Sequence, residues 1–220
     1  MEYTNIIKRI NNKICYLTIN RPKFLNALNN STITELSSVI KSINKDISVR
    51  CVIITGSEKK AFVAGADIKE FSSFNKKQGK LLSKSGHDNL FNLIENLDIP
   101  CIAAINGFAL GGGLELAMAS HIRIASTNAK LGFPEVTLGV IPGYGGTQRL
   151  AHLVGKGKAI EMIITASMIS AEEAKELGLI NHVCEEEELI PTAEKIASKI
   201  KRNSPMAIGN AIKSINTSFN

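Results

Sequence analysis

The feature that most constrains the fold is a long apolar stretch, residues 101–120, in which Glu115 is the one charged side chain. Its length raises the question of a membrane span. Asn106-Gly107 is a turn signal, and the glycines at 111–113 interrupt the stretch again, so it divides into two short pieces. A buried strand followed by a buried helix fits this pattern better, and we reject a membrane span.

Short apolar runs alternate with segments of helical periodicity along the chain. The sequence predicts strands at 14–19, 51–55, 101–105 and 122–125, and helices at 31–43, at 81–97, from about 112, and in several segments between 145 and 215. Ser31 or Thr32 is the predicted N-cap of the first of these helices. The alternation of strand and helix predicts an α/β core.

Composition describes an ordinary globular chain. It has 220 residues, of which 44% are hydrophobic and 21% charged, which is enough for one full core in one main domain. The segment MEYTNIIKRI has no basic region followed by a long apolar one, so no signal peptide is expected. The cysteines lie far apart and within apolar runs, which predicts buried thiols in a cytoplasmic protein: Cys15, Cys51, Cys101 and Cys184.

The net charge of +6 and the pI near 9.1 favour an anionic partner. Nucleic-acid binding usually combines basic with aromatic side chains, whereas aromatics make up only 5% of this chain and Trp is absent. The basic residues are also scattered. A phosphorylated small molecule would explain the modest charge excess as well, and we expect no nucleic-acid partner.

The sequence lacks the motifs of several common classes of nucleotide-binding proteins and hydrolases. A P-loop is absent, and Gly111-x-Gly113 lacks the third glycine of a dinucleotide fingerprint because Leu116 stands in that place. Neither HExxH nor GxSxG occurs. The four histidines have no ligand spacing, so we expect no metal site.

Two glutamates carry the strongest chemical signal. Glu115 follows the glycine run in the first turn of an apolar helix, and Glu135 lies in the apolar, proline-broken segment 131–139. A buried carboxylate is costly, and two of them near exposed backbone N–H groups predict an acid/base pair beside an oxyanion site. The small residues Ala64, Gly65 and Ala66 and the glycines at 111–113 would let a ligand approach such N–H groups. Taken alone, the glycine run would be better explained by tight packing of a helix on a strand.

Four motifs, in order and nearly end to end, together resemble the crotonase (enoyl-CoA hydratase/isomerase) family. They are Asn20-Arg21-Pro22-x-x-x-Asn26-Ala27-Leu28, the segment 62–69, Ile105-Asn106-Gly107-Phe108-Ala109-Leu110-Gly111-Gly112-Gly113-x-Glu115-Leu116, and Pro134-Glu135 with Ile141-Pro142-Gly143-x-Gly145-Gly146-Thr147-Gln148-Arg149-Leu150. Each motif alone would be weak. Arg21 and Lys23 could be plain surface charges, and residues 143–146 could be only a turn.

The resemblance implies a spiral core of stacked ββα units followed by C-terminal helices. It divides the chain into a catalytic core, residues 1–190, and residues 191–220, which are the start of a helical C-terminal region. Compared with the family pattern, we expect this helical region to be incomplete. It also implies an acyl-CoA thioester as substrate, no cofactor beyond the CoA of the substrate, no metal, and a homotrimer or hexamer.

By the same resemblance, Glu115 and Glu135 are the catalytic residues of an enoyl-CoA hydratase. Such an enzyme performs reversible syn addition of water to a trans-2-enoyl-CoA, and we expect a short, four-carbon acyl group. The backbone N–H groups of Ala66 and Gly112 are the implied oxyanion donors. The implied substrate and CoA contacts are Ala64, Ala66, Asp67, Ile68, Lys69, Gly112, Pro134 and Gly143.

We expect different protonation states for the two glutamates. The helix dipole would keep Glu115 ionised to polarise water, and desolvation would raise the pKa of Glu135 so that it protonates C2. Both could instead hold one water and share the protons. The alternatives are an enoyl-CoA isomerase, which would tolerate loss of Glu115, and a non-catalytic crotonase-like binding module, for instance for RNA.

Overall fold

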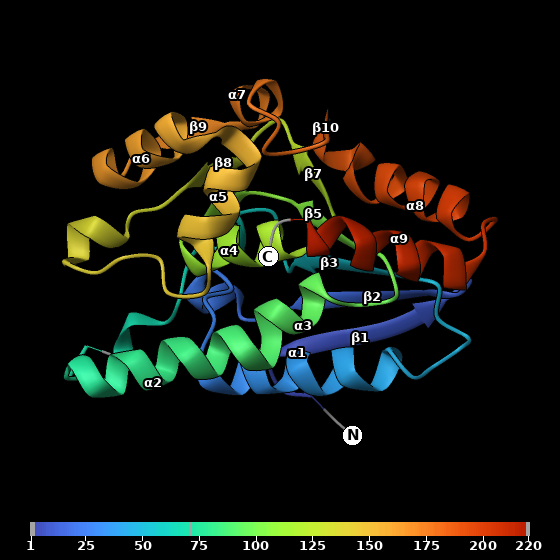
Figure 1. Cartoon of the computed structure of the whole chain (residues 1–220), viewed down its shortest axis with the longest axis horizontal. Helices are drawn as coiled ribbons and strands as arrows, with labels where there is room; N and C mark the ends of the chain where they lie inside the picture. The colour runs from blue at the N-terminus through green and yellow to red at the C-terminus, as the bar shows by residue number, and fades with distance from the viewer. Residues whose placement is uncertain (1–2, 71, 219–220) are drawn as a thin grey trace.

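The computed structural model describes residues 3–70 and 72–218 and contains two sheets covered by helices (Figure 1). The strands are β1 (Ile6–Asn11), β2 (Ile14–Ile19), β3 (Cys51–Gly56), β4 (Ala61–Val63), β5 (Cys101–Ile105), β6 (Phe108–Leu110), β7 (Ile122–Ser126), β8 (Lys130–Gly132), β9 (Met168–Ser170) and β10 (His182–Cys184). The helices are α1 (Asn30–Ile43), α2 (Lys76–Gly86), α3 (Asn92–Glu95), α4 (Gly112–Ala119), α5 (Gly146–Val154), α6 (Lys156–Thr165), α7 (Ala171–Glu176), α8 (Leu189–Ile200) and α9 (Pro205–Thr217). Short 3-10 turns are η1 (Pro22–Phe24), η2 (Ile68–Glu70), η4 (Glu135–Leu138) and η5 (Glu186–Glu188), and η3 (His87–Phe91) is a π-helical turn.

The order in which the chain visits the two sheets accounts for the expected spiral core of strand–strand–helix units. The larger has the strand order β1-β2-β3-β5-β7-β10, and the smaller has β4-β6-β8-β9. Along the chain, each of the pairs β3/β4, β5/β6 and β7/β8 places its first strand in the larger sheet and its second in the smaller one. Within each sheet these strands run parallel. The chain therefore repeats a strand–strand–helix unit, which confirms the expected crotonase-like α/β fold.

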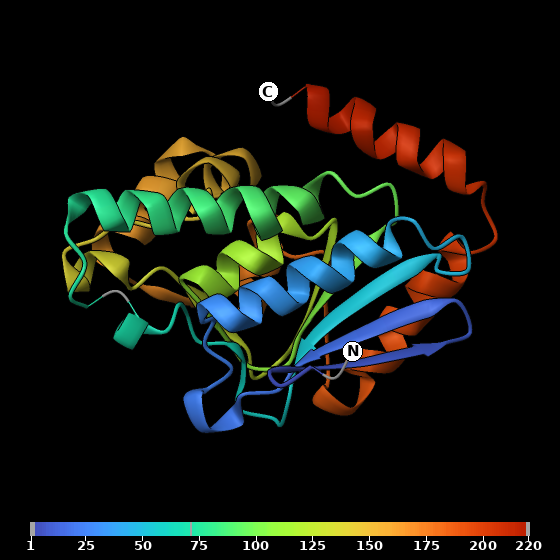
Figure 2. The ribbon, with the colours of Figure 1, turned by 90° about the horizontal axis from the view of Figure 1, so that it is seen from below.

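The central strands β3, β5 and β7 of the larger sheet are buried on both faces, whereas the edge strand β1 is largely exposed. The alternating side chains of the inner strands divide into two cores. Cys15, Leu17, Val52 and Ile54 pack toward a core that includes α1 and α4, whereas Ile14, Cys51 and Ile53 pack toward α8. Figure 2 shows α1 and α8 on opposite sides of the strands. Strands buried on both faces appear as continuous apolar runs in a sequence, which is why the runs at 14–19 and 51–55 were recognisable.

The helix boundaries differ from the prediction in two places. The N-cap of α1 is Asn29, whose side chain accepts a hydrogen bond from the Thr32 N–H at 2.8 Å, and not Ser31 or Thr32. The helix predicted at 81–97 begins earlier, because Asn75 and Gln78 form a capping box before α2. It then continues through the π turn at 87–91 and ends with α3.

The three-residue strands and β1 were not predicted. Three residues are too few to display a period of two, so the smaller sheet had no clear signal in the sequence. The division of the chain at residue 190 stays a prediction. In the segment 191–220, most of α8 and all of α9 are helical and residues 201–204 connect them, and Ala193 and Ala197 of α8 are fully buried against the larger sheet.

Candidate active site

The first backbone donor of the site lies where β6 turns into α4. Gly111 has φ +50° and ψ −122°, a conformation that L side chains rarely adopt, and it places Gly112 at the first position of the helix. A Cβ on Gly113 would lie 1.9 Å from the Val63 carbonyl oxygen, so the start of α4 packs directly against β4. The Gly112 N–H has no partner within the helix, as is general for a first turn.

The second donor lies in the loop after β4. The Leu28 N–H donates to the Gly65 oxygen at 2.9 Å, and the Asp67 N–H donates to the Leu28 oxygen at 2.8 Å. The Ala66 N–H between these two bonds has no acceptor among the described residues. A Cβ on Gly112 would lie 3.4 Å from the Ala66 nitrogen. The fold thus brings together two N–H groups that are 46 positions apart in the printed sequence.

Glu115 is buried one turn into α4, with 1% of its surface exposed. Its Oε1 accepts two backbone hydrogen bonds of 2.7 Å each, from the N–H groups of Tyr144 and Gly146. Both bonds go to Oε1, so Oε2 is the oxygen left for a reactant. Burial raises the pKa of Glu115 to about 7, against the lowering effect of these two N–H groups.

Glu135 is the first residue of η4, and its side chain lies against Gly111, next to the start of α4. A Cβ on Gly111 would lie 2.4 Å from Glu135 Oε1, so the carboxyl group sits against the backbone that leads into α4. Its Oε2 is buried and has no hydrogen-bond partner among the described residues. Burial raises the pKa of Glu135 to about 7. An unpaired buried oxygen is costly and indicates a functional group.

The helix dipole does not hold the pKa of Glu115 at its ordinary value. A helix N-terminus stabilises a charge by about 0.3–2 kcal/mol, whereas burial of a carboxylate opposes ionisation by more. The pKa of Glu115 is therefore raised like that of Glu135, whose negative charge adds to the effect. Near neutral pH such a pair holds about one proton between its two carboxyl groups.

The other predicted contacts surround these groups. Ala64 is half-buried, and its N–H donates to the Leu25 oxygen at 3.0 Å. Ile68 and Lys69 are exposed on η2. Pro134 is the N-cap residue of η4, and the Gly143 oxygen accepts a short hydrogen bond from the Ser83 hydroxyl. All of them flank the loop of Ala66 or the approach to Glu135.

Arg21 has a defined place in the fold, so its interpretation as a plain surface charge is wrong. Its Nη2 pairs with Asp67 Oδ2 at 3.0 Å, and its Nη1 donates to the Ala27 oxygen. The guanidinium carbon also lies 4.7 Å from the centre of the Phe24 ring. This pairing ties the first motif to the loop that carries Ala66.

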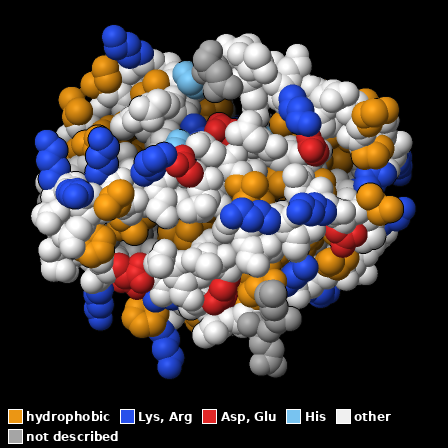
Figure 3. Space-filling view, turned by 60° about the horizontal axis from the view of Figure 1, so that its bottom comes forward, with side chains coloured by type: hydrophobic (Ala, Val, Ile, Leu, Met, Phe, Trp, Pro, Cys, Tyr) orange, Lys and Arg blue, Asp and Glu red, His pale blue; other side chains and the backbone are white. Residues whose placement is uncertain are grey.

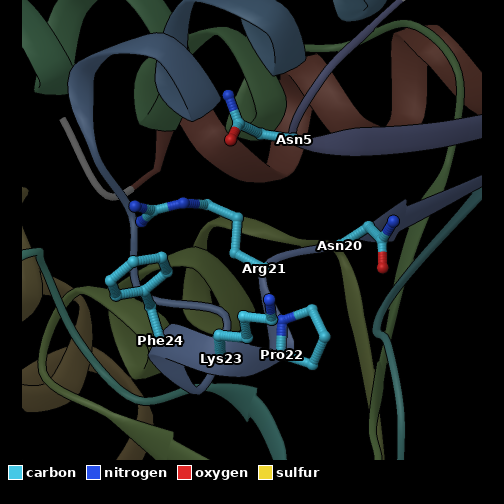
Figure 4. A pocket seen from close by; sticks show the side chains of 6 residues that line it. All are labelled: Asn5, Asn20, Arg21, Pro22, Lys23 and Phe24. Atoms are coloured by element: carbon cyan, nitrogen blue, oxygen red, sulfur yellow. The ribbon is translucent and has the colours of Figure 1, made fainter.

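A cavity of about 370 Å³ lies beside this pair (Figure 4). It is lined by Asn5, Asn20, Arg21, Pro22, Lys23 and Phe24. Two of these side chains are cationic; Arg21 is paired with Asp67, so Lys23 is the charge that could meet an anionic group here. It lies on the first-motif side of the Ala66 loop and is separate from the two glutamates.

Two residues of the site escaped the sequence analysis. Tyr144 stacks on Phe91 with ring centres 4.5 Å apart and planes at 11°, and Arg149 is buried with 7% exposure. Arg149 stands in the fourth motif, and the available signal in the sequence was an arginine three positions after the pair Gly145-Gly146. Within the described ranges, no group of three His, Cys, Asp or Glu side chains could hold a metal ion.

Comparison with known proteins agrees with this geometry. The chain matches the enoyl-CoA hydratase/isomerase family over residues 9–220 and belongs to that family. It is 50% identical over 216 residues to a short-chain-enoyl-CoA hydratase of Clostridium acetobutylicum, a match that covers 98% of this chain and 82% of the relative. It is 48% identical over 208 residues to a crotonyl-CoA hydratase of Syntrophomonas wolfei, covering 94% and 80%.

Solved structures show the same fold. A crystal structure of an enoyl-CoA hydratase from Bacillus anthracis superposes with a TM-score of 0.92 at 42% identity, covering 97% of this chain and 83% of that one. One from Geobacillus kaustophilus superposes with a TM-score of 0.94 at 34% identity, covering 100% and 84%. In the part of the chain that the structure describes, no helix is both long and apolar enough to cross a membrane.

Proposed function

We propose that this chain is an enoyl-CoA hydratase that adds water reversibly, with syn geometry, to a short-chain trans-2-enoyl-CoA. One observation carries the proposal: two carboxyl groups with pKa values near 7 lie beside Ala66 and Gly112, whose backbone N–H groups are close together. The matched relatives are named as hydratases of short enoyl-CoA substrates, which supports the same activity here.

In the proposed mechanism, Glu115 is the base. Its Oε1 is held by two N–H groups, which favours the carboxylate, and Oε2 takes a proton from water as the water oxygen bonds to C3. The electrons of the C2–C3 double bond move toward the thioester, and the enolate oxygen accepts hydrogen bonds from Ala66 and Gly112. Glu135 is the acid and gives its proton to C2. One water is added, and the pair again holds one proton.

The proposed contacts follow the path of the thioester. The carbonyl group lies over Ala66 and Gly112, with Ala64 and Asp67 on one side and Pro134 and Gly143 on the other. We place the CoA along the exposed Ile68 and Lys69, toward the cavity that contains Arg21 and Lys23. Cationic side chains there suit the phosphates of CoA. The mechanism uses only side chains, backbone and water, so we propose no cofactor or metal.

Tyr144 supports a short acyl group. A Cβ on Gly86 would lie 2.4 Å from the ring, and a Cβ on Gly112 would lie 3.6 Å from it. The ring therefore fills the space between α2 and the oxyanion donor, where a longer acyl chain would have to pass. A four-carbon substrate such as crotonyl-CoA fits this restriction.

We also propose that the chain is cytoplasmic and assembles with further copies of itself, as a trimer or hexamer. Four free cysteines support the compartment. Exposed apolar side chains on α6, β9 and the segment after Glu135 support assembly: Leu138, Val140, Ile141, Ile160, Ile164 and Met168. On the face drawn in Figure 3, basic side chains are scattered among apolar and uncharged ones, which does not favour an RNA-binding module.

The experiment follows loss of the enoyl-thioester absorbance when crotonyl-CoA is added to the protein. We expect Glu135→Gln and Glu115→Gln each to lower kcat by roughly a hundredfold to ten-thousandfold. Lys158→Met, far from the site, is the control. A chain that isomerises a 3-enoyl-CoA, and retains this activity with Glu115→Gln, would instead be an isomerase.

A further inference from the structure

The position of Glu115 depends on the segment 144–146. The N–H groups of Tyr144 and Gly146 both point at Glu115 Oε1. Gly145 between them has φ +89°, a left-handed conformation that aims the N–H groups on either side of it at one oxygen. A change in this segment would therefore move or release the carboxyl group.

Arg149 holds the same segment from the opposite side. Its Nη1 donates to the Tyr144 oxygen at 2.7 Å, and its backbone N–H donates to the Gly145 oxygen at 3.0 Å. A Cβ on Gly145 would lie 2.5 Å from Nη1, so the guanidinium packs directly against this backbone. The carbonyl groups of segment 144–146 thus accept hydrogen bonds from Arg149, and the N–H groups of the same segment donate to Glu115.

The guanidinium is itself fixed by α3. Its Nε donates to Glu95 Oε1 at 3.0 Å and its Nη2 to Glu95 Oε2 at 2.6 Å, a bidentate ion pair. Nη2 also donates to Asn92 Oδ1 at 3.1 Å. All three nitrogens are occupied in a planar fork that a lysine ammonium cannot reproduce.

We propose that Arg149, held by Glu95, is a positioning residue for Glu115: it fixes the two N–H donors that bind the carboxylate and places a positive charge behind them. The proposal rests on the proposed function and deepens it. It makes the ionisation of the base dependent on an ion pair that does not contact the substrate.

The charges around Glu115 support this role. Glu135 on η4 raises the pKa of Glu115, whereas the charge of Arg149 on α5 lowers it. Tyr144 contributes a neutral hydroxyl, since burial raises its pKa to about 12. His87 of the π turn also faces this region, because a Cβ on Gly145 would lie 3.2 Å from its Nδ1. The ion pair is therefore one of several groups that set the charge of the base.

The test is the titration of the Glu115 carboxyl carbon by NMR in protein labelled with 13C-glutamate, assigned by its loss in Glu115→Gln. We expect Arg149→Met to raise the midpoint by about one pH unit, because a stabilising charge is lost. Glu95→Gln should lower the midpoint, because it removes the charge that offsets Arg149. Arg149→Lys keeps the charge but loses the fork, so it should raise the midpoint by less than Arg149→Met does and still lower kcat at least tenfold.

Lys158→Met is the matched control, since Lys158 pairs with Glu161 and Glu173 away from the site and should leave the midpoint unchanged. If the ion pair only stabilised the fold, Arg149→Met and Glu95→Gln would both have a lower melting temperature, and the titration midpoint would not move in opposite directions. That result would overturn the proposal. The titration needs no substrate. If the midpoint shifted in opposite directions in Arg149→Met and Glu95→Gln but the protein had no hydratase activity, the proposed function would be refuted and the positioning role of Arg149 would stand.

Discussion

At the scale of single residues, the central observation is that burial outweighs the helix dipole at Glu115. The carboxyl group sits at a helix N-terminus and accepts two N–H bonds, yet its pKa is about 7. Catalysis of hydration needs one carboxylate and one carboxylic acid at the same pH. A pair of carboxyl groups that share one proton near neutrality provides both.

The raised pKa of Glu115 predicts a pH-dependent stability change in Glu115→Gln. The folded protein binds this proton up to about pH 7, whereas the unfolded chain releases it near 4.5. The stability linked to the bound proton is fully present below pH 4.5 and is lost as pH rises through 7. Glu115→Gln should therefore be more stable than the parent by up to about 3 kcal/mol above pH 7.

Urea unfolding at pH 4.5 and pH 8 measures this effect. The variant should gain nothing at the lower pH, where the parent carboxyl group is already neutral. A gain of equal size at both pH values would show that the charge of Glu115 is not the cause.

Tyr144 predicts the limit on acyl length. Tyr144→Ala should raise the ratio of kcat/KM for eight-carbon to four-carbon enoyl-CoA by at least about tenfold, because the ring no longer fills the space beside Gly112. Steady-state rates on the two substrates measure the ratio. Tyr144→Phe retains the ring and should retain the parent ratio. An unchanged ratio in the alanine variant would mean that the acyl chain takes another path.

At the scale of elements, the close packing of α4 on β4 sets the separation of the two proposed oxyanion donors, Ala66 and Gly112. Gly113→Ala would place a methyl group 1.9 Å from the Val63 oxygen and push the helix away from the strand. We expect a loss of about 1–3 kcal/mol in the free energy of unfolding. We also expect roughly a hundredfold or greater loss in kcat, because the Gly112 donor moves.

Gly157→Ala on α6 is the control for this prediction, since no heavy atom lies within 4 Å of its added Cβ. It should leave kcat unchanged and raise stability by at most about 1 kcal/mol, through helix propensity. Thermal melts and crotonyl-CoA kinetics compare the two variants. Equal kinetics for both would show that the packing at Gly113 does not position the donor.

At the scale of the whole molecule, α6 and the neighbouring segment 138–141 carry an apolar surface that a single chain leaves exposed. Ile164 is 68% exposed on this surface. Ile164→Asp should reduce the proposed trimer or hexamer to smaller species, measured by light scattering, because a carboxylate would be buried in the contact. Ile47→Asp, at a side chain that is 97% exposed elsewhere, is the control. An unchanged mass for Ile164→Asp would place the contact on another face.

The sequence by itself determined the α/β class, the strands at 14–19, 51–55 and 101–105, and the two glutamates. These features are local: continuous apolar runs mark strands buried on both faces, and a carboxylate among apolar residues is conspicuous wherever it folds. The four motifs added the family and the proposal that Ala66 and Gly112 are the oxyanion donors.

Only the tertiary structure decided what surrounds these residues. The three-residue strands β4, β6 and β8 form because neighbouring strands pair with them, which no periodicity of their own could indicate. The raised pKa of Glu115 follows from burial by segments that are distant in sequence, whereas the local helix dipole alone indicated a low pKa. The hydrogen bond from the Tyr144 N–H to Glu115 spans 29 positions and the ion pair of Arg149 with Glu95 spans 54, because electrostatics and packing act through space and not along the chain.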